Sequence, residues 1–304
     1  MGALADFVKS DMSPESVSVG GALRAEAANA FIDAVRDQSG LLKQTTLRRM
    51  MKLSADLSVL DIMSRILVRV TEGTEPSSGQ KANPANVGKT LQALPVQLFF
   101  TILFSTLSDN QDVPDFEGQL AAMFAKKFSS ELEDLGINGT ADTGASFLAL
   151  NKGWVQLAKD YAGTGIGDSR AVNVQTLSDD YVGKLETVMA AQDDRFDAES
   201  TLILSSKDYR GLVVDLGAEP GGVGFVVSGK VDGLLGKPIW VSPFLSPGTV
   251  LYTPLPNLVW GINRDIERYR EVRGTKRCID YTFNIACDFE IAVNRACVVG
   301  YNMD

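Results

Sequence analysis

The side chains that most often perform catalysis are scarce in this sequence. None of the 304 residues is histidine, which excludes Ser-His-Asp catalysis, Cys-His catalysis and imidazole metal sites. The three cysteines, Cys278, Cys287 and Cys297, lack the close Cys-x-x-Cys spacing of zinc and redox sites. We interpret them as reduced core residues with no ligand or disulfide role.

One short motif imitates a phosphate-binding loop. Gly88, Lys89 and Thr90 match the end of the P-loop pattern, in which a glycine-rich backbone cradles phosphates and the lysine reaches them. However, Asn83 occupies the position of the required upstream glycine, and polar residues precede it instead of a buried strand. The sequence therefore predicts no nucleotide site, and we expect no cofactor and no metal ion.

Two pairs of adjacent carboxylates have the chemistry of general acids and bases. They are Asp179 with Asp180 and Asp193 with Asp194. Adjacent residues do not face a common point on either a helix or a strand, so we predict solvated helix ends. The expected protein is not an enzyme, although a histidine-free carboxylate hydrolase stays open as an alternative from another class.

The composition is that of a globular protein. Hydrophobic residues make up 45% of the chain and the formal net charge is −9, which disfavours a broadly basic nucleic-acid face. The amino terminus has no basic stretch followed by an apolar core, so no signal peptide is predicted. The longest apolar run, residues 94–107, is shorter than the roughly 20 residues of a membrane helix, and we predict a buried strand there.

The first half of the chain predicts a helix, a projecting hairpin and a longer helix. Residues 18–38 carry apolar residues at helical spacing, and Ser39 and Gly40 should end this helix. Residues 41–70 are expected to be extended, residues 71–89 form a polar tip, and residues 91–107 return as an apolar strand. A long helix is predicted over 116–135, with Asp115 as its N-cap and Gly136 just past its end.

The second half predicts another helix and several strands. Residues 179–192 have helical periodicity, and 201–204 form a short apolar strand leading into a polar turn. Short strands separated by Pro and Gly turns are expected at 239–241, 250–252 and 258–262. Residues 279–289 alternate apolar and polar side chains, which predicts one long, half-buried strand. The fold class is therefore α+β.

Four segments resemble the major capsid proteins of tailed bacteriophages, which have the HK97-like capsid fold. Gly236–Pro243 and Asn257–Ile266 resemble two successive strands of that family, and Cys287–Tyr301 resembles its closing hairpin. Asn151–Trp154 resembles a segment of the P2-type branch. The order of the predicted elements matches the family over most of the chain, and it carries more weight than any single motif.

The resemblance implies a domain organisation and a set of contact residues. It implies an N-terminal arm at 1–40, an extended E-loop hairpin at 54–95, a P-domain with a long spine helix at 41–53, 96–165 and 271–304, and an A-domain at 166–270. Trp240, Phe244 and Trp260 are expected in the core, or else at an interface. The candidates for contacts between subunits are Arg48, Arg49, Arg65, Arg69, Lys81, Lys89, Arg264, Glu267, Arg268, Arg270 and Glu271.

The function implied by this resemblance is structural. The chain would self-assemble into hexamers and pentamers of an icosahedral shell that encloses double-stranded DNA without sequence-specific binding and without a membrane. A scaffold protein, a portal and a decoration protein are the other expected partners. Assembly would take place in the bacterial host cytoplasm, and the protein would reside in the virion capsid. An encapsulin-like nanocompartment, with the same fold around a protein cargo, is the nearest alternative.

Overall fold

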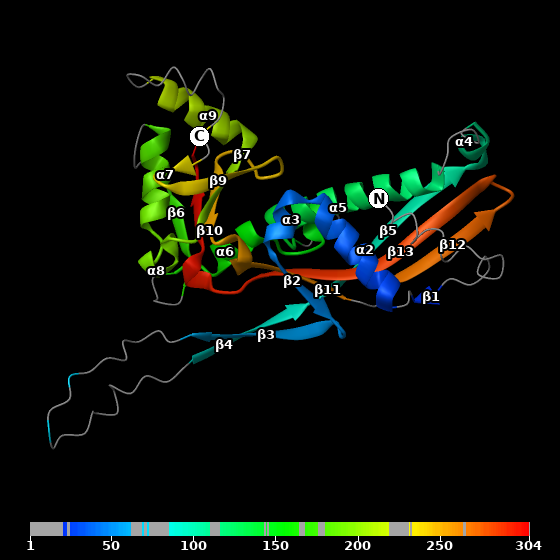
Figure 1. The fold of residues 1–304 in the computed structure, drawn as a ribbon, viewed down its shortest axis with the longest axis horizontal. Helices are drawn as coiled ribbons and strands as arrows, with labels where there is room; N and C mark the ends of the chain where they lie inside the picture. The colour runs from blue at the N-terminus through cyan, green and yellow to red at the C-terminus, as the bar shows by residue number, and fades with distance from the viewer. Residues whose placement is uncertain are drawn as a thin grey trace.

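The computed structural model describes residues 21–22, 25–61, 69, 72, 85–109, 116–142, 144, 146–163, 168–175, 180–218, 231, 233–263 and 266–303. The fold is mixed α and β, as predicted (Figure 1). Two larger sheets form the body, and a two-stranded hairpin extends from it.

The first sheet is organised around β13 (Cys278–Ile291), the long alternating strand predicted from the sequence. One edge of β13 pairs with the whole length of β5, from Cys278 to Cys287, while the other edge pairs first with β12 and then with β11. A parallel strand, β2, extends the sheet beyond β11. The bounds of the other strands are β1 (Gly21–Ala22), β2 (Thr46–Met50), β5 (Leu94–Leu103), β11 (Leu258–Asn263) and β12 (Glu267–Arg273).

Two helices cover one face of this sheet (Figure 1): α2 (Ala25–Gln38) and α5 (Phe116–Asn138). The ring of Phe31 in α2 stacks on Phe128 of α5 and on Phe283 of β13, both with centroids 6.0 Å apart. Aromatic pairs at such distances add to the free energy gained by burying their area. The helix predicted over 18–38 is thus confirmed over its described part, and its narrow apolar stripe packs on α5.

The long helix α5 continues further than the sequence predicted. It ends at Asn138, and Gly136 lies inside it. A Cβ at Gly136 would lie 2.8 Å from Phe289 Cε1 and 3.1 Å from Trp154 Cζ3, so this glycine permits close packing instead of ending the helix. Gly139 follows the last turn, and its N–H donates to Leu135 O at 2.9 Å. Asp115, the predicted N-cap, lies outside the described residues.

Strands β3 (Ser54–Asp61) and β4 (Ala85–Gln92) form an antiparallel hairpin that points away from the body (Figure 1). The predicted extended segment at 41–70 is therefore confirmed for β2 and β3. It is wrong at α3 (Gly40–Gln44), because Ser39 Oγ accepts the Leu42 N–H at 3.0 Å and starts a new helix. The polar tip predicted at 71–89 lies mostly outside the described residues.

The second sheet lies at the far end of the body from α4 (Phe104–Asp109) (Figure 1). The predicted strands at 201–204, 239–241 and 250–252 are confirmed in it. In spatial order it contains β6 (Arg170–Asn173), β14 (Val298–Tyr301), β10 (Thr249–Thr253), β7 (Thr201–Ser205), β9 (Lys237–Ser242) and β8 (Gly233–Leu234).

Helices pack against this second sheet: α7 (Tyr181–Ala190), within the helix predicted over 179–192, and α9 (Ser206–Ala218). The polar turn predicted after β7 is wrong. Ser205 Oγ accepts the Asp208 N–H at 3.0 Å and donates to Asp208 Oδ2 at 2.7 Å, and these contacts begin α9. The remaining helical segments are η3 (Phe147–Ala149), α6 (Trp154–Asp160), α8 (Asp194–Asp197), η4 (Leu255–Asn257) and η5 (Asn294–Ala296).

A continuous core joins α2, α3, α5 and α6 to the first sheet. Trp154 and Trp260 are fully buried in it, and Trp240 and Phe244 pack against it partly buried. The prediction of core packing for Trp240, Phe244 and Trp260 is thus confirmed. All three cysteines are buried and free, as predicted, and burial raises the pKa of the Cys287 and Cys297 thiols to about 12.

The sheets do not follow the predicted domain ranges at two places. The range 166–270 includes β11 and the start of β12, which pair with β13 in the first sheet. The range 271–304 includes β14, which pairs with β6 and β10 in the second sheet. The chain crosses between the two sheets more than once. One of these crossings is at η5, which leads from the end of β13 directly into β14.

Candidate functional site

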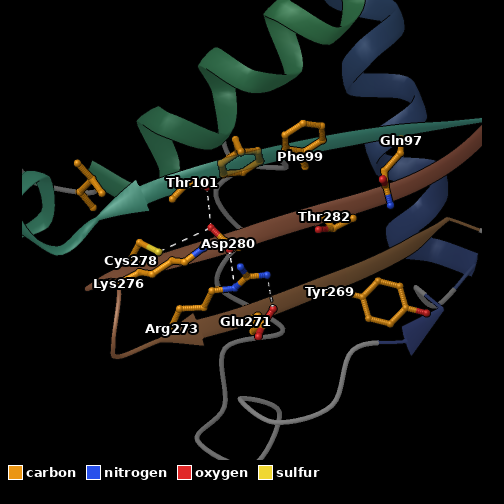
Figure 2. A pocket seen from close by; sticks show the side chains of 12 residues that line it. Gln97, Phe99, Thr101, Tyr269, Glu271, Arg273, Lys276, Cys278, Asp280 and Thr282 are labelled. Atoms are coloured by element: carbon orange, nitrogen blue, oxygen red, sulfur yellow. Dashed lines mark hydrogen bonds and ion pairs between the residues drawn. The ribbon is translucent and has the colours of Figure 1, made fainter.

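The first sheet has one face that α2 and α5 cover and one face that lies open. Side chains alternate along strands, so the register places every second residue of β5, β13 and β12 on this open face. We call it the outer face (Figure 2). From strand to strand its rows are Gln97, Asn284 and Glu267; Phe99, Thr282 and Tyr269; Thr101, Asp280 and Glu271; and Leu103, Cys278 and Arg273.

The centre of the outer face exposes aromatic surface. Phe99 is 77% exposed and Tyr269 is 40% exposed, on either side of Thr282. Leu103 is also exposed, and these residues line a shallow groove together with Lys276 from the β12–β13 turn. Exposed apolar surface that is rimmed by polar groups is typical of protein–protein contact sites. This face is therefore the strongest candidate for an interaction surface.

Fixed polar contacts border the exposed aromatic row on one side. Asp280 accepts a hydrogen bond from Thr101 Oγ1 at 2.6 Å, and its Oδ2 lies 2.9 Å from Arg273 Nε (Figure 2). Arg273 also contacts Glu271 Oε2 at 3.0 Å. Glu271 and Asp280 together hold the pKa of the Arg273 guanidinium above its usual value. Charged groups that already pair within one chain restrict which partner fits beside them.

A second row of polar contacts borders the other side. Gln97 Nε2 donates to Asn284 Oδ1 at 2.9 Å, and Asn284 Nδ2 donates to Glu267 Oε2 at 3.0 Å. Tyr269 OH donates to the same carboxylate oxygen at 3.2 Å, and Glu267 raises the pKa of Tyr269. The aromatic row therefore lies between two hydrogen-bonded borders that belong to β5, β13 and β12.

A different polar cluster lies where β4 meets the body. Lys89 Nζ is 2.9 Å from Glu290 Oε1 and 2.6 Å from Ile291 O. Its side chain is 10% exposed and that of Glu290 is 9% exposed. Tyr161 OH donates to Glu290 Oε2 at 3.0 Å, and the Tyr161 ring centroid is 3.9 Å from Lys89 Nζ. This cluster fixes the base of the hairpin against β13 and the end of α6.

Burial shifts the pKa values of ionisable groups at this base. It lowers the pKa of the Lys89 ammonium, although Glu290 acts in the opposite direction. It raises the pKa of Tyr161, and Glu290 adds to that rise. Asp288, whose Oδ2 accepts the Gln92 N–H at 2.7 Å, has its pKa raised to about 6, mainly because of burial. Each shift follows from removing a charged form from water.

The structure separates the contact residues that the sequence predicted. Glu267 and Glu271 lie on the outer face, whereas Arg270 lies on the opposite face, where its Nε donates to Tyr281 OH at 3.2 Å. Arg268 shares the register side of Arg270 and pairs with β1. Sequence alternation along β12 would have separated these residues, had the strand been assigned.

The basic residues predicted along β2 and the hairpin differ in their surroundings. Arg48 is exposed, and Arg49 forms an ion pair with Asp33 of α2. Arg69 is exposed, while Arg65, Lys81 and Arg264 lie outside the described residues. The placement of Lys89 in an exposed loop was wrong, because it lies in β4 and points into the body.

Several residues of these clusters escaped the sequence analysis. Phe99 belongs to a run predicted as a buried strand, but along β5 only Ile102 is buried. Glu290, Asn294 and Tyr161 all contact Lys89, Asn294 through a hydrogen bond from Lys89 Nζ to its Oδ1. More than seventy residues separate each of them from Lys89 in the sequence. The apolar run at 94–107 was the one local signal, and it could not tell which face of the strand would be covered, because both faces carry apolar residues.

The residues considered for catalysis have structural roles. Asp180 Oδ2 accepts the Gly183 N–H at 3.0 Å and caps α7, and Asp193 caps α8 through the Arg195 N–H. The helix ends predicted for the two carboxylate pairs are thus confirmed at Asp180 and Asp193, while Asp179 lies outside the described residues. Among the described residues, no group of three or more Cys, Asp or Glu could hold a metal ion.

In the described part of the chain, no helix combines the length and the apolarity needed to cross a bilayer. The run at 94–107 is β5 followed by α4.

Comparison with known proteins gives one curated relative and many solved structures. No family model matches the chain. It is 24% identical over 141 residues to "Putative prophage capsid protein YqbE" of Bacillus subtilis (strain 168). That match covers 46% of this chain and 45% of the relative, so the chain spans less than half the length of the curated relative it matches.

The structural matches extend over almost the whole chain. A chain of the satellite phage P4 procapsid, solved with its size determination protein, aligns with a TM-score of 0.66 at 13% identity. The alignment covers 90% of this chain and 98% of that one. A virus-like particle from Pyrococcus furiosus aligns with a TM-score of 0.52 at 13% identity, covering 89% and 96%. The chain therefore has the HK97-like capsid fold, as its sequence motifs predicted.

Proposed function

We propose that the chain is the major capsid protein of a tailed bacteriophage, which assembles into hexamers and pentamers of an icosahedral shell around the DNA genome. The observation that carries this proposal is the alignment of 90% of the chain with 98% of a phage procapsid protein. A shared fold alone supports many functions, so the surfaces provide the second argument.

Two surfaces fit a subunit that contacts its neighbours. The β3–β4 hairpin points away from the body (Figure 1), and an isolated two-stranded hairpin is only marginally stable in water. The outer face exposes Phe99 and Tyr269 between fixed polar borders. We infer that neighbouring subunits cover both surfaces in the shell, and that Glu267 and Glu271 lie at such a contact.

The domain division follows as part of the proposal. Residues 54–95 correspond to the E-loop, and residues 1–40 to the N-terminal arm. The first sheet with its spine helix α5 corresponds to the P-domain, and the second sheet with α7 and α9 to the A-domain. In this division β11 and β12 belong to the P-domain, while β14 belongs to the A-domain.

The partners follow from the proposed shell. The chain would bind copies of itself first, and a scaffold, a portal and a decoration protein would complete the particle. A net charge of −9 fits a container for double-stranded DNA better than a sequence-specific DNA reader. Assembly would occur in the host cytoplasm, and the mature location would be the virion capsid.

Electron microscopy of the purified protein tests the proposal. We expect rings, tubes or closed shells in negative stain, either from the protein alone or after co-expression with its scaffold. A species that stays monomeric in sedimentation under both conditions would contradict it, and measurable hydrolytic turnover by that monomer would favour the hydrolase.

The virus-like particle from Pyrococcus furiosus has the same fold, so the contents of the shells need a separate measurement. Shells purified from infected or induced cells should contain double-stranded DNA. Shells that enclose a protein and no genome would identify an encapsulin-like compartment instead.

A further inference from the structure

The sheet edge formed by β12 is only partly covered in the described part of the chain. β1 lies beside β12 (Figure 1) and pairs with it antiparallel through two residues, Gly21 with Arg268 and Ala22 with Glu267. Beyond this pairing, residues 269–273 have β13 on one side and none of the described strands on the other. An open edge of this length is a template for another strand.

The register of β1 fixes which residues would lie on this edge if the strand continued toward the N-terminus. Each step back along the chain from Gly21 is a step forward along β12 from Arg268. Gly20 would therefore lie opposite Tyr269, and Ser16 opposite Arg273, where β12 ends. Because Gly20 is bonded directly to Gly21, the strand nearest to the open edge is the same chain's own segment 16–20.

The valines of this segment match the sheet face that α2 and α5 cover. On that face, Ile102, Ile279 and Val272 form one row across β5, β13 and β12. The two isoleucines are buried, whereas Val272, at the edge of the row, is 49% exposed. In the register of β1, Val17 would be the next residue of this row. It would cover Val272 and extend the apolar row by one strand.

The serines of the same segment match the outer face. Ser18 would lie beside Glu271, and Ser16 beside Arg273. A shift of one residue would exchange the two faces, so that serine would lie against Val272 and both valines would lie among charged groups. The alternation of residues 16–19 thus agrees with the register that β1 sets, and the two observations are independent.

The segment and the edge also end at the same place. Pro14 has no N–H to donate to a strand, and the register places it opposite Thr275, in the turn that follows β12. Glu15 would lie opposite Gly274, at the start of the turn that carries the exposed Lys276. Opposite charges at neighbouring positions of two strands favour their pairing.

We propose that residues 16–20 extend β1 into a strand over 16–22, along the free edge of β12 in the same chain. This strand covers Val272 and closes an edge that could otherwise pair with another protein. It also directs residues 1–15 toward the β12–β13 turn, where Phe104 N–H of α4 donates to Arg277 O at 2.9 Å. The inference concerns the isolated chain and does not depend on the shell function.

Pairs of cysteines across the two strands test the proposal in the full-length chain. Directly opposite pairs alternate between a narrow and a wide spacing, so we use two neighbouring pairs, Val17→Cys with Val272→Cys and Ser18→Cys with Glu271→Cys. On mild oxidation, at least one pair should form a disulfide within the chain, seen as the loss of two hydrogen atoms and as a cross-linked peptide. Ser18→Cys with Val272→Cys is the matched control and should stay reduced, because its side chains would lie on opposite faces.

The outcomes of this test are distinct. Absence of a disulfide from both pairs, or an equal yield in the control, would overturn the proposal. Disulfides that join two chains would show that another copy occupies the edge, and they would also overturn it. Peptide mapping separates the new bond from any bond to the native cysteines, which are buried.

Hydrogen exchange of the wild-type chain provides a measurement that needs no substitution. The amides of residues 16–20 should exchange at least about tenfold more slowly than those of residues 1–13, because strand pairing protects them from water. Equal exchange rates in the two segments would contradict the strand.

Discussion

Gly136 in α5 faces Phe289 in β13 so closely that a Cβ on Gly136 would lie 2.8 Å from Phe289 Cε1. This contact determines how near the spine helix approaches the central strand. Trp154 of α6 packs at the same place, since its ring lies edge-to-face on Phe289 with centroids 5.3 Å apart. The three core elements α5, β13 and α6 therefore pack together at Gly136.

Gly136→Ala should destabilise the chain. The methyl group would have to displace two buried rings, and overpacking of this kind costs about 1–3 kcal/mol of unfolding free energy. Urea denaturation followed by fluorescence gives the value. Gly274→Ala is the matched control, because its Cβ would meet nothing within 4 Å. Equal stabilities of the two variants would contradict the packing argument.

Phe99 and Phe100 are neighbours on opposite faces of β5, and their truncations should have different effects. Phe99→Ala removes exposed surface and should change the unfolding free energy by less than about 0.5 kcal/mol, yet weaken assembly. Phe100 stacks on Phe124 at 3.6 Å and on Tyr281 at 5.0 Å, so Phe100→Ala should cost about 3 kcal/mol. Thermal unfolding and negative-stain microscopy measure the two effects. Normal shells from Phe99→Ala would argue against the outer face as a contact.

The pH dependence of stability should report Asp288. Its pKa is raised from 3.8 to about 6 in the folded chain, so the folded state binds this proton more tightly than the unfolded state. The free energy of unfolding should therefore fall as the pH rises from about 4 through about 6, by a term on the order of 1 kcal/mol. In Asp288→Asn this term should disappear, whereas in Asp109→Asn, an exposed carboxylate, it should persist.

The hairpin should be dispensable for folding and necessary for assembly. Asp61 and Ala85 are paired in register, so an Asn-Gly turn can replace residues 62–84 and close the two strands. This variant keeps Lys89 in place, whereas a deletion over 71–89 would also remove the cluster at the hairpin base. We expect a stable monomer by size exclusion and no shells in the microscope.

A Gly/Ser linker of the same length as residues 62–84 provides the control for chain length. It should fail to assemble in the same way if the side chains of this segment make the contacts. Shells from either variant would refute the role proposed for the hairpin.

The sequence by itself determined the elements whose signals are local. Strict alternation over 279–289 predicted β13, and helical periodicity predicted most of α2, α5 and α7, because side-chain direction repeats with backbone geometry. The cysteines were predicted as buried thiols from their spacing alone. The ends of helices were predicted less accurately. Gly136, predicted to lie just past the end of α5, lies inside this helix and permits its close packing.

Only the tertiary structure decided how distant segments combine. Residues 89 and 290 belong to segments that are 201 positions apart, and no local pattern links them. The exposed position of Phe99 depends on which face of β5 the helices α2 and α5 cover, and both faces of this strand are rich in apolar residues. Periodicity fixes which side chains share a face, but the packing of other elements fixes which face meets water.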